Sequence, residues 1–386
     1  MPEKTVVVLG GGTGGLVTAH HLARTKDGHR IVLVERDPVY HFAPSLLWVL
    51  SGARRPEQIT VDLRRLTARR GIELTQADVQ AIDVDAGRID TSTGSIPYDR
   101  LVVALGAELA PDILPGFAQG AHNVYTVEGA VSAGRALEEF QGGRVVVLVS
   151  RLPYKCPAAP YETALLAEAL LRKRGVRSSA TVDIYTPEPF PMPTAGPVLG
   201  EALRGILERR QIGFHPEHTV ERIEPETREL VLTSGERVAY DLLLGVPPHR
   251  APAPVRASGL AAETGFIPVD RATLATTADG VFAIGDVTTI PVAGGKFLPK
   301  AGVFAHGQAE VVAKRIAAEL AGRPPSDAFD GKGACFVEMG DGIAAYATGN
   351  FYADDAPQVT LRRPGRHWHL AKVAVEKYWL KRWLLP

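Results

Sequence analysis

Two segments of this sequence are predicted to form a buried strand, a turn and a helix, and only the first has glycines in its turn. The first begins with the apolar run 5–9, followed by Gly10, Gly12 and Gly15 in the spacing G-x-G-x-x-G, and the next apolar strand ends at Glu35. Glycine lets the backbone approach a pyrophosphate, and an acid at that place accepts hydrogen bonds from ribose hydroxyls. We therefore predict an α/β fold that binds a dinucleotide at its N-terminal unit.

The second segment has the same order of elements but a different turn. The apolar strand ends near Ser150, the helix follows, and no glycine stands between Ser150 and Glu162. Cys156 lies in this turn together with three prolines, which have no N–H group to donate to a phosphate: Pro153, Pro157 and Pro160. We predict a second Rossmann-like domain whose dinucleotide site was rebuilt around a thiol.

Two later strands indicate which dinucleotide binds. One ends in a turn of small residues at Gly106, and the other ends at Gly285 and Asp286. With these segments the chain resembles the two-dinucleotide-fold flavoproteins of the disulfide reductase superfamily. The resemblance implies FAD, with Asp286 on the ribityl hydroxyls. The alternative role for Asp286 is a helix N-cap, and both roles are compatible.

Composition favours a multi-domain enzyme. The 386 residues carry a formal net charge of zero, which gives no basic excess for nucleic acid. No apolar run reaches the length of a membrane-spanning helix, and no metal site is predicted. The few residues before the first strand leave no room for a signal peptide, which predicts the cytoplasmic side.

The order of the segments predicts two Rossmann-like domains, the first of them discontinuous, and a small C-terminal unit. The FAD-binding domain is expected to begin with residues 1–108 and to resume at 265–325. The second Rossmann-like domain, which carries Cys156, is expected at 109–264, and the C-terminal unit, facing the quinone and the membrane, at 326–386.

The chain has two cysteines, Cys156 and Cys335. Two buried, inert thiols are one interpretation, and a redox pair is the other. The place of Cys156 at a helix start predicts a lowered thiol pKa. Cys335 lies in a predicted strand bounded by glycines at 331–342. Together they favour a two-electron relay beside the flavin.

At this point the chain resembles the sulfide:quinone oxidoreductase family over nearly its whole length. The segments that carry the resemblance are 153–162 around Cys156, 282–286, 298–305 and Cys335-Phe336. The resemblance implies that Cys156 and Cys335 cycle between a bridged state and a persulfide with a thiolate. Many bacterial members have a third cysteine, which this chain lacks, so FAD is expected to be bound non-covalently.

Two charged residues receive roles in this scheme. Glu162 follows Cys156 on the predicted helix and is a candidate proton carrier; its alternative is a surface acid. Lys300 precedes a predicted helix start. The resemblance implies that it supports negative charge on the flavin, and its alternative is a surface lysine.

The C-terminal segment 368–386 combines tryptophans with basic residues, which is the composition of a membrane–water interface. We expect it to bind the membrane surface, so that a quinone enters between this segment and the flavin. A helix that packs on a partner, on itself or on a second copy is the alternative, and the oligomeric state stays open. The candidate quinone-stacking rings are Phe336 first, then Tyr346, Phe351 and Phe304.

Three other functions stay open. A type II NADH dehydrogenase needs the glycine turn that the second unit lacks. The flavoprotein subunit of a flavocytochrome c sulfide dehydrogenase shares both cysteines but is exported. A redox sensor would use the cysteine pair to switch partner binding without turnover.

Overall fold

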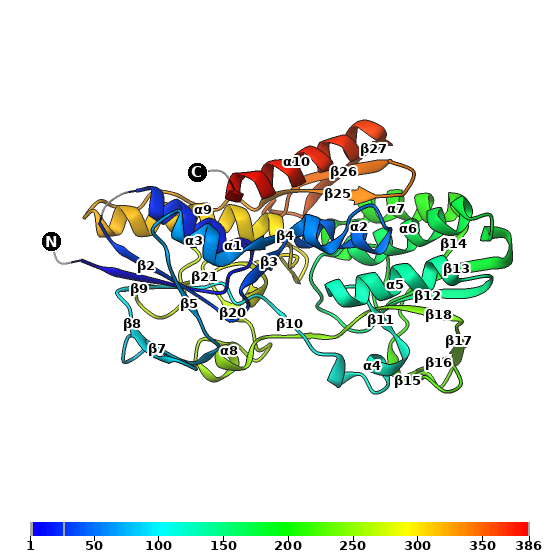
Figure 1. Ribbon diagram of the computed structural model, residues 1–386, viewed down its shortest axis with the longest axis horizontal. Coiled ribbons are helices and arrows are strands. Elements are labelled where there is room, and N and C mark those ends of the chain that lie inside the picture. Colours follow the sequence, from blue (N-terminus) through cyan, green and yellow to red (C-terminus); the bar gives the residue numbers. More distant parts are fainter. Residues whose placement is uncertain (1–2, 26–27, 385–386) are drawn as a thin grey trace.

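The computed structural model describes residues 3–25 and 28–384, with side chains through residue 381. Two α/β bodies lie side by side and two segments of the chain cross between them (Figure 1). A C-terminal sheet and helix lie along one edge of both bodies. The predicted fold class is confirmed.

The first body is built on a parallel sheet in the order β21-β9-β1-β2-β5. Its central strands are continuous runs of valine and leucine, as expected for strands covered on both faces. Helices α1 and α9 pack against one face. The bounds are β1 (Thr5–Leu9), α1 (Thr13–Arg24), β2 (Arg30–Glu35), β5 (Glu73–Gln76), β9 (Arg100–Val103), β21 (Val281–Ala283) and α9 (Gly302–Leu320).

Smaller elements complete this body. An antiparallel sheet of three strands and the short helix α8 cover the opposite face, α3 packs beside β5, and α2 reaches the second body. They are β3 (Val39–His41), α2 (Leu46–Leu50), β4 (Thr60–Asp62), α3 (Leu63–Ala68), β6 (Val79–Asp83), β7 (Arg88–Thr91), β8 (Gly94–Pro97) and α8 (Ala253–Ala257).

The second body repeats the plan with a parallel sheet in the order β11-β18-β12-β13-β14. Helices α5, α6 and α7 cover one face, and an antiparallel sheet of β15, β16 and β17 covers the other. The bounds are β11 (His122–Asn123), α5 (Val127–Glu139), β12 (Gly143–Val149), α6 (Ala159–Lys173), β13 (Ala180–Tyr185), α7 (Pro197–Arg209), β14 (Ile212–His215), β15 (Val220–Glu224), β16 (Glu229–Leu232), β17 (Arg237–Ala239) and β18 (Leu242–Val246).

The two crossing segments pair with each other as the antiparallel strands β10 (Glu108–Leu109) and β19 (His249–Arg250). The first crossing segment includes β10, which begins at Glu108. The return falls ahead of residue 264, where we placed it, because Val255 and Leu260 already pack in the core of the first body.

The C-terminal unit is an antiparallel sheet of β25 (Lys332–Glu338), β26 (Ala344–Asn350) and β27 (Gln358–Gly365), followed by α10 (Arg366–Leu384). Helix α10 packs on this sheet and reaches the region of α2 in the first body. Within the described residues, no helix has the length and hydrophobicity needed to cross a bilayer.

Candidate functional site

The N-terminal glycine turn has the shape that a dinucleotide requires. Gly10 has a φ of +97°, and a side chain there would start 2.5 Å from the Ala104 carbonyl oxygen. By contrast, apart from Gly12 and its two chain neighbours, none of the described residues has an atom within 4 Å of the place where a Cβ of Gly12 would be, just before α1 begins. Glu35 accepts a hydrogen bond from the backbone N–H of Gly11 at 2.5 Å. The turn is therefore held in place by Ala104 and Glu35 on one side, and its other side is open to a pyrophosphate.

The Gly-Asp turn after β21 adds a second feature that fits FAD. One carboxylate oxygen of Asp286, Oδ1, is buried and has no hydrogen-bond partner among the described residues. Burial raises the pKa of this carboxyl, although two nearby lysines oppose the shift. Gly285, with a φ of +73°, begins the short 3-10 helix, so Asp286 is not its N-cap. A buried acceptor without a donor is what a ribityl hydroxyl would satisfy.

Lys300 supports this turn from inside the protein and is not a surface lysine. Its ammonium donates to the carbonyl oxygens of Asp286 at 2.7 Å and Thr288 at 3.0 Å, and it lies 3.4 Å from the centre of the Phe266 ring. Burial lowers the pKa of Lys300 to about 8. Gly106, with a φ of +68°, closes the turn after β9.

The loop that carries Cys156 is held against the Lys300 segment. The Cys156 N–H donates to the Lys300 carbonyl at 2.7 Å, and the hydroxyl of Tyr125 donates to the carbonyl of Lys155 at 2.8 Å. Cys156 itself has a φ of +55°, in the left-handed region that residues other than glycine seldom adopt. The thiol thus sits between the two bodies, beside the turn of Asp286.

Cys335 comes to the same place from the C-terminal sheet, and Glu162 connects the two elements. Glu162 lies in the first turn of α6, three residues after the helix begins at Ala159, and its Oε1 accepts from the Glu338 N–H of β25 at 2.8 Å. Glu162 is 4% exposed, so the alternative of a surface acid is wrong. Cys335 is half-buried on the same strand, and both cysteines are free thiols.

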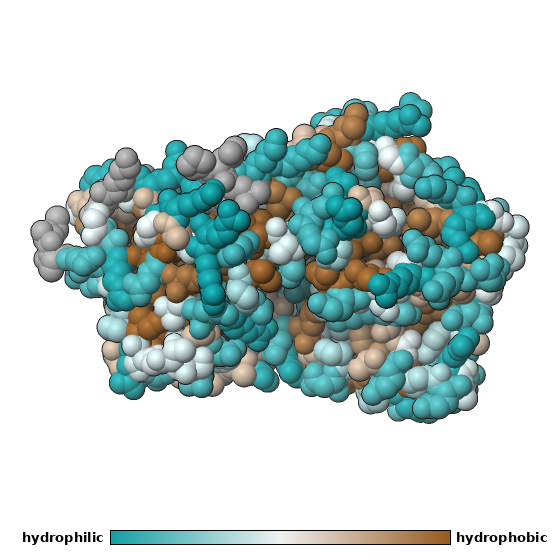
Figure 2. Space-filling view, in the orientation of Figure 1, coloured by the Kyte–Doolittle hydropathy of each residue, from teal (hydrophilic) through white to brown (hydrophobic). Residues whose placement is uncertain are grey.

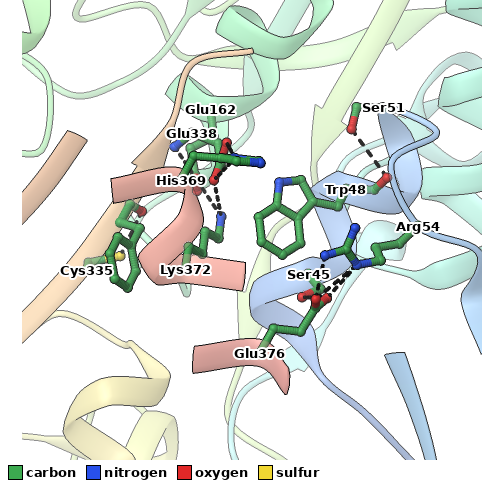
Figure 3. Close-up of polar contacts among 11 residues, drawn as sticks. Ser45, Trp48, Ser51, Arg54, Glu162, Cys335, Glu338, His369, Lys372 and Glu376 are labelled. Carbon is green, nitrogen blue, oxygen red and sulfur yellow. Dashed lines mark hydrogen bonds and ion pairs between the residues drawn. The ribbon is translucent and has the colours of Figure 1, made fainter. Parts of the chain in front are cut away.

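A group of charged residues from α10 and β25 surrounds Glu162 (Figure 3). Lys372 of α10 lies 3.2 Å from Glu162 and 4.0 Å from Glu338, and it faces the ring of Trp48 at 4.8 Å. The Nδ1 of His369 is 3.1 Å from both oxygens of Glu338. Burial disfavours the charged lysine, but Glu162, Glu338 and Cys335 together raise the pKa of Lys372.

The structure reverses our expectation for the pKa of the Cys156 thiol. Burial raises the pKa of Cys156 well above its usual value, and the charges of Cys335 and Glu162 add to the rise. Burial and Glu162 raise the pKa of Cys335 to about 12. The backbone N–H of Ala159, where α6 begins, lowers the pKa of Cys156, but burial outweighs it. Lys372 is the group that opposes both shifts.

The four candidate rings for a quinone separate into two pairs. Phe336 and Tyr346 are cross-strand partners, half-buried, with ring centres 5.2 Å apart, and Tyr346 stacks on Trp368 at 4.6 Å. Phe304 and Phe351 contact each other in the core, at 5.0 Å. Of the two pairs, the first is the one that lies against α10.

The C-terminal helix is not a free tail lying on a surface. Trp379 is 8% exposed and packs against Phe42 at 5.8 Å, and Lys372 is similarly buried. The expectation that these two side chains contact a membrane is wrong, because one face of α10 is part of the protein core. The side chains of Arg382 and Trp383 lie outside the described residues.

Glu338, His369, Lys372 and Trp48 were missed from the sequence as members of the site. The available signal was the spacing of Lys372, Glu376 and Trp379, which puts two opposite charges and a tryptophan on one side of the helix. Glu376 is held in a similar way, by hydrogen bonds from Arg54 and Ser45 (Figure 3).

Comparison with known proteins shows which families this chain resembles. The family model described as pyridine nucleotide-disulphide oxidoreductase matches residues 4–309. The sulfide-quinone reductase of Aquifex aeolicus is 27% identical over 98% of this chain and 90% of its own. The mitochondrial sulfide:quinone oxidoreductase of Mus musculus is 27% identical over 87% of this chain and 75% of its own. The X-ray structure of the Aquifex aeolicus enzyme superposes with a TM-score of 0.89 at 26% identity, over 98% of this chain and 91% of that one.

The resemblance to sulfide:quinone oxidoreductases is therefore confirmed, and the chain is a flavoprotein oxidoreductase whose cofactor is FAD. The family model spans well over half of the sequence. The chain belongs to the pyridine nucleotide-disulphide oxidoreductase family.

Proposed function

We propose that this chain oxidises sulfide to zero-valent sulfur or polysulfide at Cys156 and Cys335 and delivers the electrons through FAD to a quinone. The observation that carries the proposal is the contact of Glu162 with both β25 and Lys372. This contact holds the two elements that carry cysteines together, beside the turn of Asp286. The names of the two sulfide:quinone relatives support the same substrates.

The thiol chemistry needs a sulfur that can leave as a thiolate. In the bridged state, HS⁻ attacks one sulfur of the Cys156–Cys335 bond, which breaks to give a persulfide on one cysteine and a thiolate on the other. Lys372 stabilises that thiolate against the cost of burial. When the persulfide and the thiolate close a bridge one sulfur longer, two electrons and one proton leave. Bound FAD would supply the two-electron acceptor for this step and would pass the electrons on to a second substrate.

A series of polar side chains near the cysteines can accept the released proton. Glu162 is hydrogen-bonded to Lys372, Lys372 is close to Glu338, and Glu338 contacts His369. His369 is partly exposed. We propose this chain of groups as the proton route, with Glu162 as the first carrier.

The second substrate is proposed to bind at Phe336 and Tyr346. Phe336 follows Cys335 on β25, Tyr346 is its cross-strand partner on β26, and the centres of the two rings are 5.2 Å apart. Asp286 and Glu35 are the proposed ligands of the ribityl chain and the adenosine ribose, and Lys300 is proposed to support charge on the flavin through the turn that it braces.

The outward face of α10 is the proposed membrane contact. Leu370, Val375 and Tyr378 are exposed on it, and Lys377 and Lys381 stand among them. Apolar and charged side chains alternate along this rim of the molecule (Figure 2). Exposed aromatic and aliphatic groups beside lysines suit the headgroup region of an anionic bilayer.

The test is reduction of the bound flavin by sulfide, followed at its visible absorption band, in the wild type and in Cys156→Ser and Cys335→Ser. Sulfide should bleach the flavin of the wild type within seconds of mixing. Either serine variant should lose at least nine-tenths of the rate of sulfide-dependent quinone reduction. A tenfold loss corresponds to about 1.4 kcal/mol of barrier, so a smaller loss in both variants would exclude a cysteine relay.

NADH is the matched control donor. It should leave the flavin oxidised, because the turn around Cys156 has no glycine to receive a second dinucleotide. Rapid stoichiometric reduction by NADH would favour a NADH dehydrogenase instead. Acid precipitation should release the flavin into the supernatant, because the two cysteines are needed for the relay.

A further inference from the structure

The second α/β body retains an acid at the place where a dinucleotide would need one. In the first body, β2 ends at Glu35, whose carboxylate braces the glycine turn. In the second body, the equivalent strand β13 ends at Tyr185, and Glu188 follows shortly after it. An acid after the second strand of such a unit binds the hydroxyls of the adenosine ribose. Glu188, three residues beyond the end of β13, is the first acid to follow the second strand of this body.

Hydroxyl groups of the protein itself bind Glu188. The hydroxyl of Tyr154 donates to its Oε1 at 3.0 Å, and those of Tyr161 and Thr186 donate to its Oε2 at 2.5 Å and 3.1 Å. Glu188 is 2% exposed, and Tyr161 is fully buried. The hydroxyls of two tyrosines and of Thr186 thus satisfy the carboxylate, as the hydroxyls of a ribose would.

Both tyrosines belong to the segment that carries Cys156. Tyr154 stands two residues before it, and Tyr161 lies in the first turn of α6, just after it. One buried carboxylate thereby holds both ends of the turn. Between them, Cys156 keeps a φ of +55°, which persists only when the surrounding structure fixes it.

We propose that Glu188 is a positioning residue for Cys156, acting through the hydroxyls of Tyr154 and Tyr161, and that the same contacts close the second dinucleotide site. The role of Glu188 in turnover rests on the proposed function, whereas its effect on the reactivity of the Cys156 thiol does not. As a carboxylate, Glu188 accepts from both tyrosines. Once protonated, it must donate its own hydrogen, and one of these contacts is weakened.

The titration of Glu188 falls in the neutral range. Burial raises its pKa to about 7, against the opposing effect of the hydrogen bonds from Tyr161, Tyr154 and Thr186. The ionisable groups that face it are Tyr154 and Tyr161, and Tyr125 lies close enough to be influenced by its charge. Burial raises the pKa of all three phenols well above their usual value, so Glu188 is the group of this cluster that titrates near neutrality.

The experiment measures the reaction of Cys156 with a dithiodipyridine reagent, using FAD-loaded protein in a Cys335→Ser background. Glu188→Gln keeps the shape of the protonated acid. We compare the rate at which Cys156 reacts in Glu188→Gln/Cys335→Ser with its rate in Cys335→Ser alone. At acidic pH the ratio of the two rates should be close to one. The ratio should rise with pH, with a midpoint near pH 7, because only the ionised acid holds the turn closed. Above neutral pH the expected increase is roughly five- to tenfold, the effect of one weakened buried hydrogen bond.

Tyr154→Phe should give a similar increase above neutral pH, and Tyr240→Phe is the matched control. Tyr240 is a buried tyrosine of the same body whose hydroxyl has no bond to Glu188, and its variant should react at the background rate at every pH. A ratio that stays at one across the pH range for both Glu188→Gln and Tyr154→Phe would overturn the proposal. If the ratio rises while sulfide fails to reduce the wild type, the positioning role stands and the proposed function falls.

Discussion

Replacing Lys372 with methionine tests whether the C-terminal helix belongs to the thiol site. The substitution keeps most of the side-chain length and removes the cation that lies 3.2 Å from Glu162. At an effective dielectric constant of about 20, the attraction across that distance is about 5 kcal/mol. Both groups are more than nine-tenths buried, and removal of one partner leaves a buried charge, at a cost of about 3–5 kcal/mol.

We expect Lys372→Met to lower the free energy of unfolding by that amount at neutral pH, in urea unfolding of FAD-loaded protein followed by circular dichroism. The pKa of Lys372 is raised above that of an unfolded lysine, which is about 10.4. The stabilisation is therefore complete below that pH and is lost only as the pH rises through the folded value. Lys377→Met, an exposed lysine on the same helix, should change the stability by about 0.5 kcal/mol or less.

The pair itself is tested by the double variant Lys372→Met/Glu162→Gln. Because the charge of Glu162 is removed together with its partner, the double variant should be more stable than the sum of the single losses implies, by about 1–3 kcal/mol. If the stability loss of the double variant equals the sum of the two single losses to within about 0.5 kcal/mol, the reasoning is refuted. The same lysine variant should slow the reaction of Cys335 with a thiol reagent, because Lys372 is the group that lowers the pKa of that thiol.

The remaining predictions concern the flavin turn and the membrane contact. Gly12→Val should fold normally yet be purified without FAD, because a side chain there meets only the space left for the pyrophosphate; normal flavin content would contradict this. Gly15→Val should fail to fold, since its Cβ would lie 1.8 Å from the Gly10 carbonyl oxygen, and soluble expression checks it. Tyr378→Asp should reduce sedimentation with anionic liposomes and leave the thermal midpoint unchanged, whereas Trp379→Ala should lower the midpoint. The opposite pattern would mean that α10 does not present Tyr378 to the membrane.

Local patterns were sufficient to predict the first cofactor unit. The spacing of Gly10, Gly12 and Gly15, followed by a strand ending in Glu35, lies within one βαβ unit and is constrained by backbone geometry alone. The same holds for the second unit, whose turn visibly lacks glycine around Cys156. These features depend on neighbours in the sequence, so the sequence displays them directly.

Contacts between distant residues could not be predicted in this way. Lys372 and Glu162 are 210 positions apart, and Ser45 and Glu376 are 331 apart. A pattern of tryptophans and basic residues is equally compatible with a bilayer and with a protein core. Only the packing of α10 on both bodies turned Lys372 and Trp379 inward.

The sequence by itself determined the two Rossmann-like units, the flavin turns and the identity of the two cysteines, because each is encoded in a short segment whose backbone geometry allows few residues. The tertiary structure decided the electrostatics of the thiols. A helix start alone predicts a lowered pKa for Cys156, but desolvation between the bodies raises it, and the opposing cation comes from the far end of the chain. Burial and charge depend on what surrounds a group in space, and that is set only when the bodies and α10 pack together.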